Sequence, residues 1–356
     1  MKRIVLTGGG TAGHVTPNLA LIPRLQADGW DIHYIGAENS VEQKLIQEVH
    51  GVTYHAVTCG KLRRYFDPKN FSDPFRVVKG MVQAAHIIGQ LKPNVVFSKG
   101  GFVSVPVVYG AKLHGVPIVA HESDMTPGLA NKLSTPLAKV VCCTFPEAAK
   151  LSGKKGVYTG TPIRTEILNG DHAHAMRAFH LDAGRPVLLV VGGSSGAQAI
   201  NRMVVEALPR LLETFQVVHL CGRGNLEPEL EGTAGYRQFE YLNEGMADAY
   251  ACADVLISRA GSNTLCEILA LRKPALLIPY PKAASRGDQI LNAESFEARG
   301  LSRVLMQEDM TVESLVDGVV DLYRDRGELY EKMSLESSAN GTENVLREIY
   351  KYAKKS

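Results

Sequence analysis

Two segments half a chain apart each join an apolar strand to a glycine-rich turn, and this repeat constrains the fold most. The apolar run 4–7 leads into Gly8 to Gly13, and the run 188–191 leads into Gly192 to Gly196. The two motifs lie 183 residues apart in a chain of 356. Glycine turns of this kind are expected in any long α/β protein, but a shift of half the length favours two similar doubly wound domains.

The rest of the chain alternates short β-branched runs with helix-length segments, which is typical of βαβ units and parallel sheets. We expect strands over residues 2–7, 31–36, 53–57, 94–97, 117–120, 139–143, 186–191, 216–220, 236–239, 254–258, 275–278 and 302–305. The expected helices include 17–28, 41–49, 74–91, 128–135, 171–180, 311–324 and 343–354. Turn residues at 158–164 predict a boundary, with domains over 1–163 and 164–340 and a C-terminal helix over 341–356.

Composition excludes several classes of protein. The 39 Lys and Arg residues nearly balance 37 Asp and Glu residues, which argues against a nucleic-acid binder with a broad basic surface. The six cysteines show no metal-ligand spacing, so we expect buried thiols in a reducing cytosol. No stretch approaches the roughly 20 apolar residues of a membrane-spanning helix, so any membrane contact is expected to be peripheral.

Glycine-rich turns between a strand and a helix gather backbone N–H groups and typically bind phosphate. Neither turn is followed by the lysine of a nucleotide hydrolase. Gly8, Gly10 and Gly13 have the spacing of a dinucleotide fingerprint, which leaves an NAD-dependent oxidoreductase open, although the acid after the second strand, Glu38, comes slightly late. A third cluster at 98–104 also follows a strand, so ligand groups are expected to converge at the sheet edge.

Several polar residues follow these strands. His14 comes directly after the first turn, and Pro17 suits the first turn of the following helix. The segment 121–124 supplies a histidine and two carboxylates, which fit either a general base or a helix cap. Thr264 and Glu267 fit a capping box, while the alternative is that Glu267 accepts hydrogen bonds from a sugar diol.

Together these motifs resemble the MurG family of bacterial peptidoglycan glycosyltransferases. That family moves N-acetylglucosamine from UDP-N-acetylglucosamine (UDP-GlcNAc) to lipid I, a lipid-linked muramoyl-pentapeptide, and so makes lipid II. The motifs that carry the resemblance, in the family's order, are Gly9 to His14 with Pro17, Gly100 to Ser104, His121–Glu122, Gly160 to Arg164, Gly192 to Ala197, Ser258 to Glu267, and Asp288–Gln289.

The resemblance implies a GT-B architecture, an α/β fold of two Rossmann-like domains with doubly wound parallel sheets that face each other across a cleft. It also implies that the C-terminal domain holds the UDP-sugar and that the C-terminal helix packs back on the first domain. The binding residues implied by the motifs are Ser194 for the diphosphate, Arg164 for the donor, Glu267 for the ribose, Gln289 for the transferred sugar, Leu242 for uracil, and Thr11, Ala12 and Gly13 for the donor sugar or acceptor diphosphate.

Inverting transfer needs one base to take the proton of the acceptor hydroxyl, here the 4-hydroxyl of the muramoyl sugar. His14 is the first candidate, and Asp124 and Glu122 are the alternatives. No D-x-D motif ends a strand, so neither a metal nor another cofactor is implied. Asp124 and Asp288 stand where the family commonly has amides, which changes what they can donate.

An acceptor in a lipid bilayer requires docking at the membrane. Residues 61–79 mix six basic with four aromatic side chains, a composition that suits an anionic membrane surface and also fits a long surface loop. We therefore expect a peripheral protein on the cytoplasmic side of the cell membrane, with UDP-GlcNAc, lipid I and other cell-wall enzymes as partners. A non-catalytic UDP-sugar-binding protein of cell-wall assembly is the remaining alternative.

Overall fold

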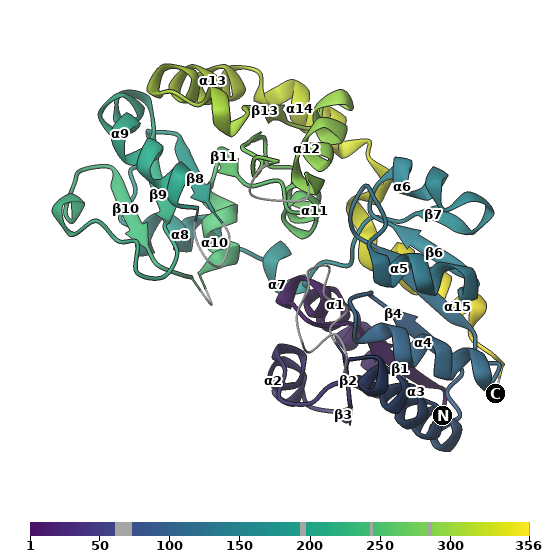
Figure 1. Cartoon of the computed structure of the whole chain (residues 1–356). Helices are drawn as coiled ribbons and strands as arrows, with labels where there is room; N and C mark the ends of the chain where they lie inside the picture. The colour runs from purple at the N-terminus through teal and green to yellow at the C-terminus, as the bar shows by residue number, and fades with distance from the viewer. Residues whose placement is uncertain (61–72, 193–196, 243–244, 283–286, 356) are drawn as a thin grey trace. The chain divides into compact units, whose positions relative to one another are not determined.

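The computed structural model describes residues 1–60, 73–192, 197–242, 245–282 and 287–355, without the side chains of 73–75 (Figure 1). The chain divides into two compact units. The first is Met1–Arg164 together with Asn340–Ser356, and the second is Thr165–Ala339. Each unit is built on its own parallel sheet, as the two glycine-turn repeats predict.

The described residues of the first unit form a seven-stranded sheet in the order β3-β2-β1-β4-β5-β6-β7, with every pair parallel. The strands are β1 (Arg3–Thr7), β2 (Asp31–Ala37), β3 (Val52–Val57), β4 (Val95–Ser98), β5 (Ile118–Glu122), β6 (Val140–Cys143) and β7 (Gly156–Tyr158). The sequence predicts the first six, because each is a compact apolar run. It misses β7, whose three residues are only half-buried.

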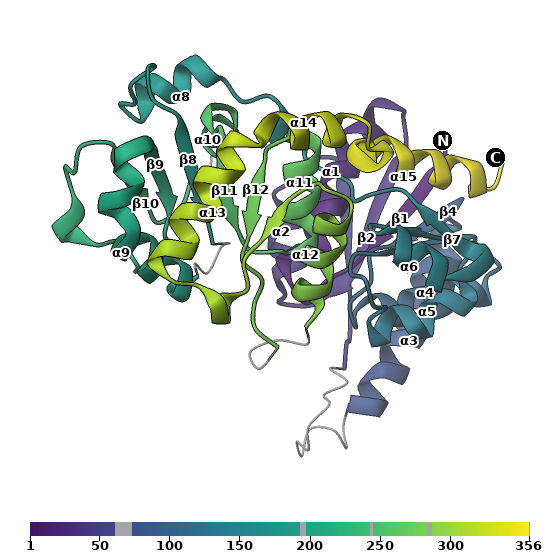
Figure 2. The same ribbon diagram turned by 90° about the horizontal axis from the view of Figure 1, so that it is seen from above.

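Helices cover both faces of this sheet, with α15 on one face and α4 and α5 on the other (Figure 2). They are α1 (Ala12–Ala27), α2 (Val41–Gln47), α3 (Asp73–Leu91), α4 (Ser104–Leu113), α5 (Leu129–Ser134), α6 (Pro146–Leu151) and α15 (Gly341–Tyr352). Helix α15 inserts Val345, Leu346 and Ile349 into the core between α1 and strands β4 to β6. The end of the chain therefore completes the unit with which the chain begins.

The described residues of the second unit form a six-stranded parallel sheet in the order β10-β9-β8-β11-β12-β13. The strands are β8 (Val187–Val191), β9 (Gln216–Leu220), β10 (Tyr236–Phe239), β11 (Val255–Ser258), β12 (Ala275–Leu277) and β13 (Arg303–Val304). The helices are α7 (Thr165–Leu168), α8 (His172–Ala178), α9 (Gln198–Thr214), α10 (Met246–Cys252), α11 (Ser262–Leu271), α12 (Asp288–Ala298), α13 (Val312–Arg324) and α14 (Arg326–Ser334). All six predicted strands are confirmed.

Both sheets begin from a central strand, extend to one side through the next two strands and then cross back. Strands β1 and β8 hold the same place, so the repeat seen in the sequence is a repeat of topology. One expectation is wrong: α1 begins at Ala12 and not near Pro17. Gly13 and His14 therefore lie in the first turn of the helix, and Pro17 lies inside it.

The cysteines lie mostly in the interior, as expected from the sequence. None of the six cysteines, all of which lie in the described ranges, forms a disulfide; five are buried and Cys59 is half-buried. Within the described ranges, no helix has the length and apolar character needed to cross a membrane.

Candidate functional site

Each sheet has a point where its strand order reverses, between β1 and β4 in the first unit and between β8 and β11 in the second. Loops that leave neighbouring strands at such a point diverge to opposite faces of the sheet, and ligands bind in the crevice between them. The first unit places the turns 8–11 and 99–103 there. The second places the turn 259–261 there, after β11, and β8 ends beside it at Val191, while residues 193–196 lie outside the described ranges.

A buried carboxylate accepts a hydrogen bond from a backbone amide of the first glycine turn. Glu42 is fully buried in α2, and its Oε2 accepts the Gly10 N–H at 3.2 Å while Oε1 accepts the Ala37 N–H at 3.2 Å. In a dinucleotide site the amides of this turn face a pyrophosphate. Here one of them is bound to a carboxylate, which argues against the oxidoreductase alternative. This role is not predictable from the sequence, because Glu42 resembles an ordinary acid in the first turn of a helix.

The turn after β4 packs directly on the turn after β1. Gly101 has φ of +81°, and a Cβ there would lie 2.2 Å from the Gly9 carbonyl oxygen and 2.7 Å from His14 Cδ2. A Cβ on Gly10 would lie 2.6 Å from the Phe102 ring. Only glycine permits these contacts, so the two turns form one surface against which the His14 ring lies.

The candidate base His14 is half-buried in the first turn of α1. The His14 backbone N–H donates to the Thr11 carbonyl at 3.1 Å, and Asn18 Nδ2 donates to the His14 carbonyl at 3.5 Å. Thr11, Ala12 and Gly13 are exposed. The structure therefore brings His14 and these three predicted binding residues together at the reversal point of the first sheet.

Glu122 ends β5 with its carboxylate turned inward. Oε1 accepts the Asp124 N–H at 3.1 Å, and Oε2 accepts Asn131 Nδ2 at 2.8 Å and the Gly128 N–H at 3.3 Å. Burial raises the pKa of Glu122 above its usual range, against these hydrogen bonds, which lower it. The carboxylate thus holds segment 124–131 in place, whereas Asp124 itself is half-buried.

Lys99 is a buried lysine that sequence reasoning did not single out. It is 1% exposed, its N–H donates to the Thr7 carbonyl at 2.8 Å, and its ammonium donates to Ser123 Oγ. It therefore ties the ends of β1, β4 and β5 to one another. Its position directly before Gly100 in a strand-end cluster was the available signal.

His121 is buried completely beside this network. Burial, with the Lys99 charge, lowers its pKa well below the usual value, so the ring is neutral. Its Nε2 lies 3.0 Å from the Gly160 carbonyl, which makes Nε2 the protonated nitrogen. His121 thus joins β5 to the turn at 160 and does not serve as a proton acceptor at the surface.

In the second unit, the predicted diphosphate residue Ser194 lies outside the described residues. Arg259, within the matching turn after β11, is 6% exposed and donates to the carbonyls of Ile278 at 2.9 Å and Pro279 at 3.2 Å. Its guanidinium also stacks on the Tyr280 ring at 4.1 Å. The Arg259 side chain thereby connects the end of β11 to the chain that follows β12.

The capping-box interpretation of Thr264 and Glu267 is wrong. Helix α11 begins at Ser262 with Gly261 as its N-cap, so Thr264 lies inside the first turn, and no N-cap side chain accepts a backbone N–H there. Glu267 is half-buried one turn further on, with Tyr250 Oη 3.5 Å from its Oε2.

The other predicted donor residues lie at element ends. Gln289, in the first turn of α12, accepts the Tyr280 N–H through its Oε1 at 3.2 Å. Leu242 is half-buried after β10 and packs near Gly245. Arg164 is exposed at the end of the first unit's continuous segment. Across the described ranges, no group of three or more His, Cys, Asp or Glu side chains has the arrangement of a metal site.

Comparison with protein families and curated proteins gives a consistent result. Residues 4–143 match the glycosyltransferase family 28 N-terminal domain and residues 187–348 match its C-terminal domain. A Clostridium botulinum protein is 51% identical over 355 residues, which are 99% of this chain and all of that protein. A Clostridium tetani protein is 50% identical over 352 residues, 99% of this chain and 98% of that protein. Both are named UDP-N-acetylglucosamine–N-acetylmuramyl-(pentapeptide) pyrophosphoryl-undecaprenol N-acetylglucosamine transferase.

Solved structures agree with these matches. The crystal structure of Acinetobacter baumannii MurG superposes with a TM-score of 0.80 at 28% identity, covering 99% of this chain and all of that one. A calicheamicin glycosyltransferase superposes with a TM-score of 0.69 at 16% identity, covering 99% and 98% of the two chains. The second likeness concerns the fold alone.

Proposed function

The chain belongs to the MurG family within glycosyltransferase family 28, and from that membership we propose that it transfers N-acetylglucosamine from UDP-GlcNAc to N-acetylmuramyl-(pentapeptide) pyrophosphoryl-undecaprenol. The match over the whole length, through both units, carries this proposal. The transfer is a step of peptidoglycan synthesis. On the basis of the same family membership, we propose that the transfer inverts the configuration at the anomeric carbon and that the muramoyl 4-hydroxyl is the nucleophile.

The second unit suits the donor. UDP leaves with growing negative charge, and the amides of a helix N-terminus stabilise such charge without moving. The N-cap of α11, Gly261, supplies no side-chain acceptor to those amides. We assign Glu267, one turn along α11, to the ribose hydroxyls, and Gln289, in the first turn of α12, to the transferred sugar. Arg164, Ser194 and Leu242 complete the proposed donor set.

The first unit suits proton removal from the acceptor. We assign the base to His14, because its ring lies at the reversal point of the sheet against Gly101 and is partly open to solvent. Asp124 is the alternative, two strands away after β5. Glu122 is the weakest of the three, because its carboxylate already accepts hydrogen bonds on both oxygens.

A transfer assay with labelled UDP-GlcNAc and lipid I tests the reaction and its base. We expect His14→Ala to lose at least about 100-fold in turnover, the usual contribution of a general base. Asp124→Asn should retain most activity, and His50→Ala, at an exposed histidine of the same unit, should retain all of it. Donor-dependent thermal stabilisation without any transfer would instead identify a non-catalytic UDP-sugar-binding protein.

Peripheral docking on the cytoplasmic membrane is the second part of the proposal. Most of the basic and aromatic segment 61–79 lies outside the described residues. Helix α3, which begins within this segment, and the neighbouring α4 expose large apolar side chains: Val78 is 59% and Val82 66% exposed on α3, and Leu113 is 76% exposed at the end of α4. Val78 and Val82 are four residues apart, so they share one face of α3.

Basic side chains accompany this apolar surface. Arg76, Lys79 and Lys112 are all exposed on the same two helices, which pack against each other. Exposed apolar and basic side chains on neighbouring helices are a combination that suits binding to anionic lipid. Vesicle co-sedimentation tests this: Val82→Ser should weaken binding to phosphatidylglycerol vesicles, whereas Leu335→Ser, at an isolated exposed residue of the second unit, should not.

A further inference from the structure

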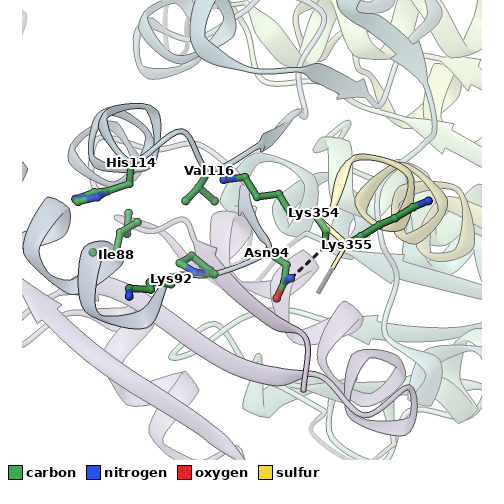
Figure 3. Close-up of a pocket in the computed structure, with 9 residues that line it drawn as sticks. Ile88, Lys92, Asn94, His114, Val116, Lys354 and Lys355 are labelled. Atoms are coloured by element: carbon green, nitrogen blue, oxygen red, sulfur yellow. Dashed lines mark hydrogen bonds between the residues drawn. The ribbon is translucent and has the colours of Figure 1, made fainter.

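The first unit contains a surface hollow of about 470 Å³ at the edge of its sheet opposite the candidate site (Figure 3). It lies where β4 and β5 begin, whereas the glycine turns lie where strands end. The end of α3, the link from Lys92 to Asn94, the segment 114–116 and the tail at 354–355 line it. None of these residues belongs to the transfer site proposed above.

The hollow is basic. Lys92, His114 and Lys354 surround it, and its lining contains no Asp or Glu. Figure 3 shows the Lys354 side chain extending toward Val116, while the Lys355 ammonium points away on the other side of the chain. Ile88 and Val116 add an apolar wall. Two lysines and an imidazole around one space favour an anion with several acceptor oxygens.

The lining is held in place by specific contacts. Asn94 fixes the tail twice: its carbonyl accepts the Lys354 N–H at 3.0 Å, and its Nδ2 donates to the Lys354 carbonyl at 3.0 Å. A Cβ on Gly89 would lie 2.9 Å from His114 Cε1, so this glycine makes room for the ring against α3.

Lys92 adds a conformational observation. It follows α3 with φ of +47°, a left-handed conformation that favours glycine and asparagine at helix ends. A lysine there costs conformational free energy, and residues held in such conformations tend to have a use for their side chain. The chain thus keeps a lysine side chain at a position where the backbone conformation favours glycine.

We propose that this hollow binds a phosphate group, either of free phosphate or of a phospholipid headgroup. Phosphate offers oxygens on several sides, which matches cations on opposite walls, and the hollow is open at the surface, so a phosphate attached to a lipid fits as well as a free one. The site is independent of the transfer reaction.

The test follows the His114 side chain by NMR in the whole protein, with its signal assigned through His114→Gln. Titration with inorganic phosphate, at constant ionic strength held by chloride, is expected to shift the His114 signal saturably. Lys354→Gln should weaken this binding about fivefold or more, whereas Lys355→Gln is the matched control and should change it less than about twofold.

A second arm separates the two phosphate sources. Phosphatidylglycerol vesicles and neutral phosphatidylcholine vesicles are compared with the same two variants by co-sedimentation. A Lys354-specific loss on phosphatidylglycerol identifies a headgroup site, and a Lys354-specific loss with inorganic phosphate alone identifies a site for free phosphate. The proposal is overturned if neither ligand gives a saturable effect, or if Lys354→Gln and Lys355→Gln weaken binding equally. Transfer by Lys354→Gln, measured with the donor and lipid I, reports separately on the proposed function.

Discussion

Replacing Glu122 with glutamine separates a positioning role of this carboxylate from a role as general base. In the folded protein both oxygens accept hydrogen bonds, Oε1 from Asp124 and Oε2 from Asn131 and Gly128. Glutamine has nearly the same shape but only one acceptor oxygen, because its other terminal atom is an NH2 donor. One oxygen position must then hold a donor that faces another donor.

The expected loss in the free energy of unfolding depends on which hydrogen bond the glutamine cannot make. The glutamine oxygen keeps two partners, Asn131 Nδ2 and the Gly128 N–H, if it takes the Oε2 position. Its NH2 group then faces the Asp124 N–H, so that hydrogen bond is lost. A hydrogen bond to a charged group contributes about 1.5–3 kcal/mol, and removing a buried charge offsets part of this, so we expect a loss of about 2 kcal/mol. Segment 124–131 should open about 30-fold more often, because 1.4 kcal/mol corresponds to a factor of ten.

Two measurements report on these effects. Trp30 is the chain's single tryptophan, buried in the first unit, so urea unfolding followed by its fluorescence reports on that unit. Hydrogen exchange at the Asp124 and Gly128 amides reports the local opening. Glu38→Gln, at an exposed acid of the same unit, is the control and should change stability by less than about 0.5 kcal/mol. If Glu122→Gln abolishes transfer while unfolding and amide exchange stay at wild-type values, Glu122 acts on the substrate and the positioning argument is wrong.

Three further predictions concern stability. Burial lowers the pKa of His219 to about 4, so below the ordinary value of 6.5 the folded state binds fewer protons than the unfolded state. The second unit should therefore lose about 3 kcal/mol of stability as the pH falls from 6.5 to 4. Denaturation curves of the wild type and of His219→Gln at several pH values measure this loss, and an equal dependence of stability on pH in both proteins would contradict it. Gly101→Ala should cost about 2–4 kcal/mol through backbone strain and the contact with the Gly9 carbonyl, against almost nothing for Gly128→Ala, which faces open space. Thr311→Ala should cost about 1 kcal/mol, because Thr311 caps α13, while an equal loss in Thr264→Ala would restore the capping box rejected above.

The sequence predicts the strands well because a buried parallel strand is a continuous apolar run. The positions of β1, β9 and β10 were predicted to within one residue. Helix starts are less regular: α1 begins five residues before the expected start, because its first turn is built from glycine and small residues that do not show helical periodicity. The short strand β7 has too little apolar character to stand out.

The sequence predicts where the residues of the candidate site lie in the fold better than it predicts what their side chains do. The turns and strand ends that carry His14, Glu122 and Glu267 were correctly located at sheet edges. The buried charges were not foreseen, because Glu42 and Lys99 resemble surface residues until their partners are known. Those partners lie 24 to 32 residues away in sequence, at Ser123 and Gly10, and no local pattern encodes such pairs.

The return of the C-terminal helix to the first unit determines the order in which the protein can fold during synthesis. Val345, Leu346 and Ile349 belong to the core that contains β1 and α1. These side chains emerge from the ribosome only after all of residues 165–339 have been made, which takes roughly 10–30 s at bacterial elongation rates. During that interval the first unit holds an open apolar face, whereas the second unit is a single continuous segment that completes its core as soon as it emerges. The half of the protein that is made first is therefore the last to close.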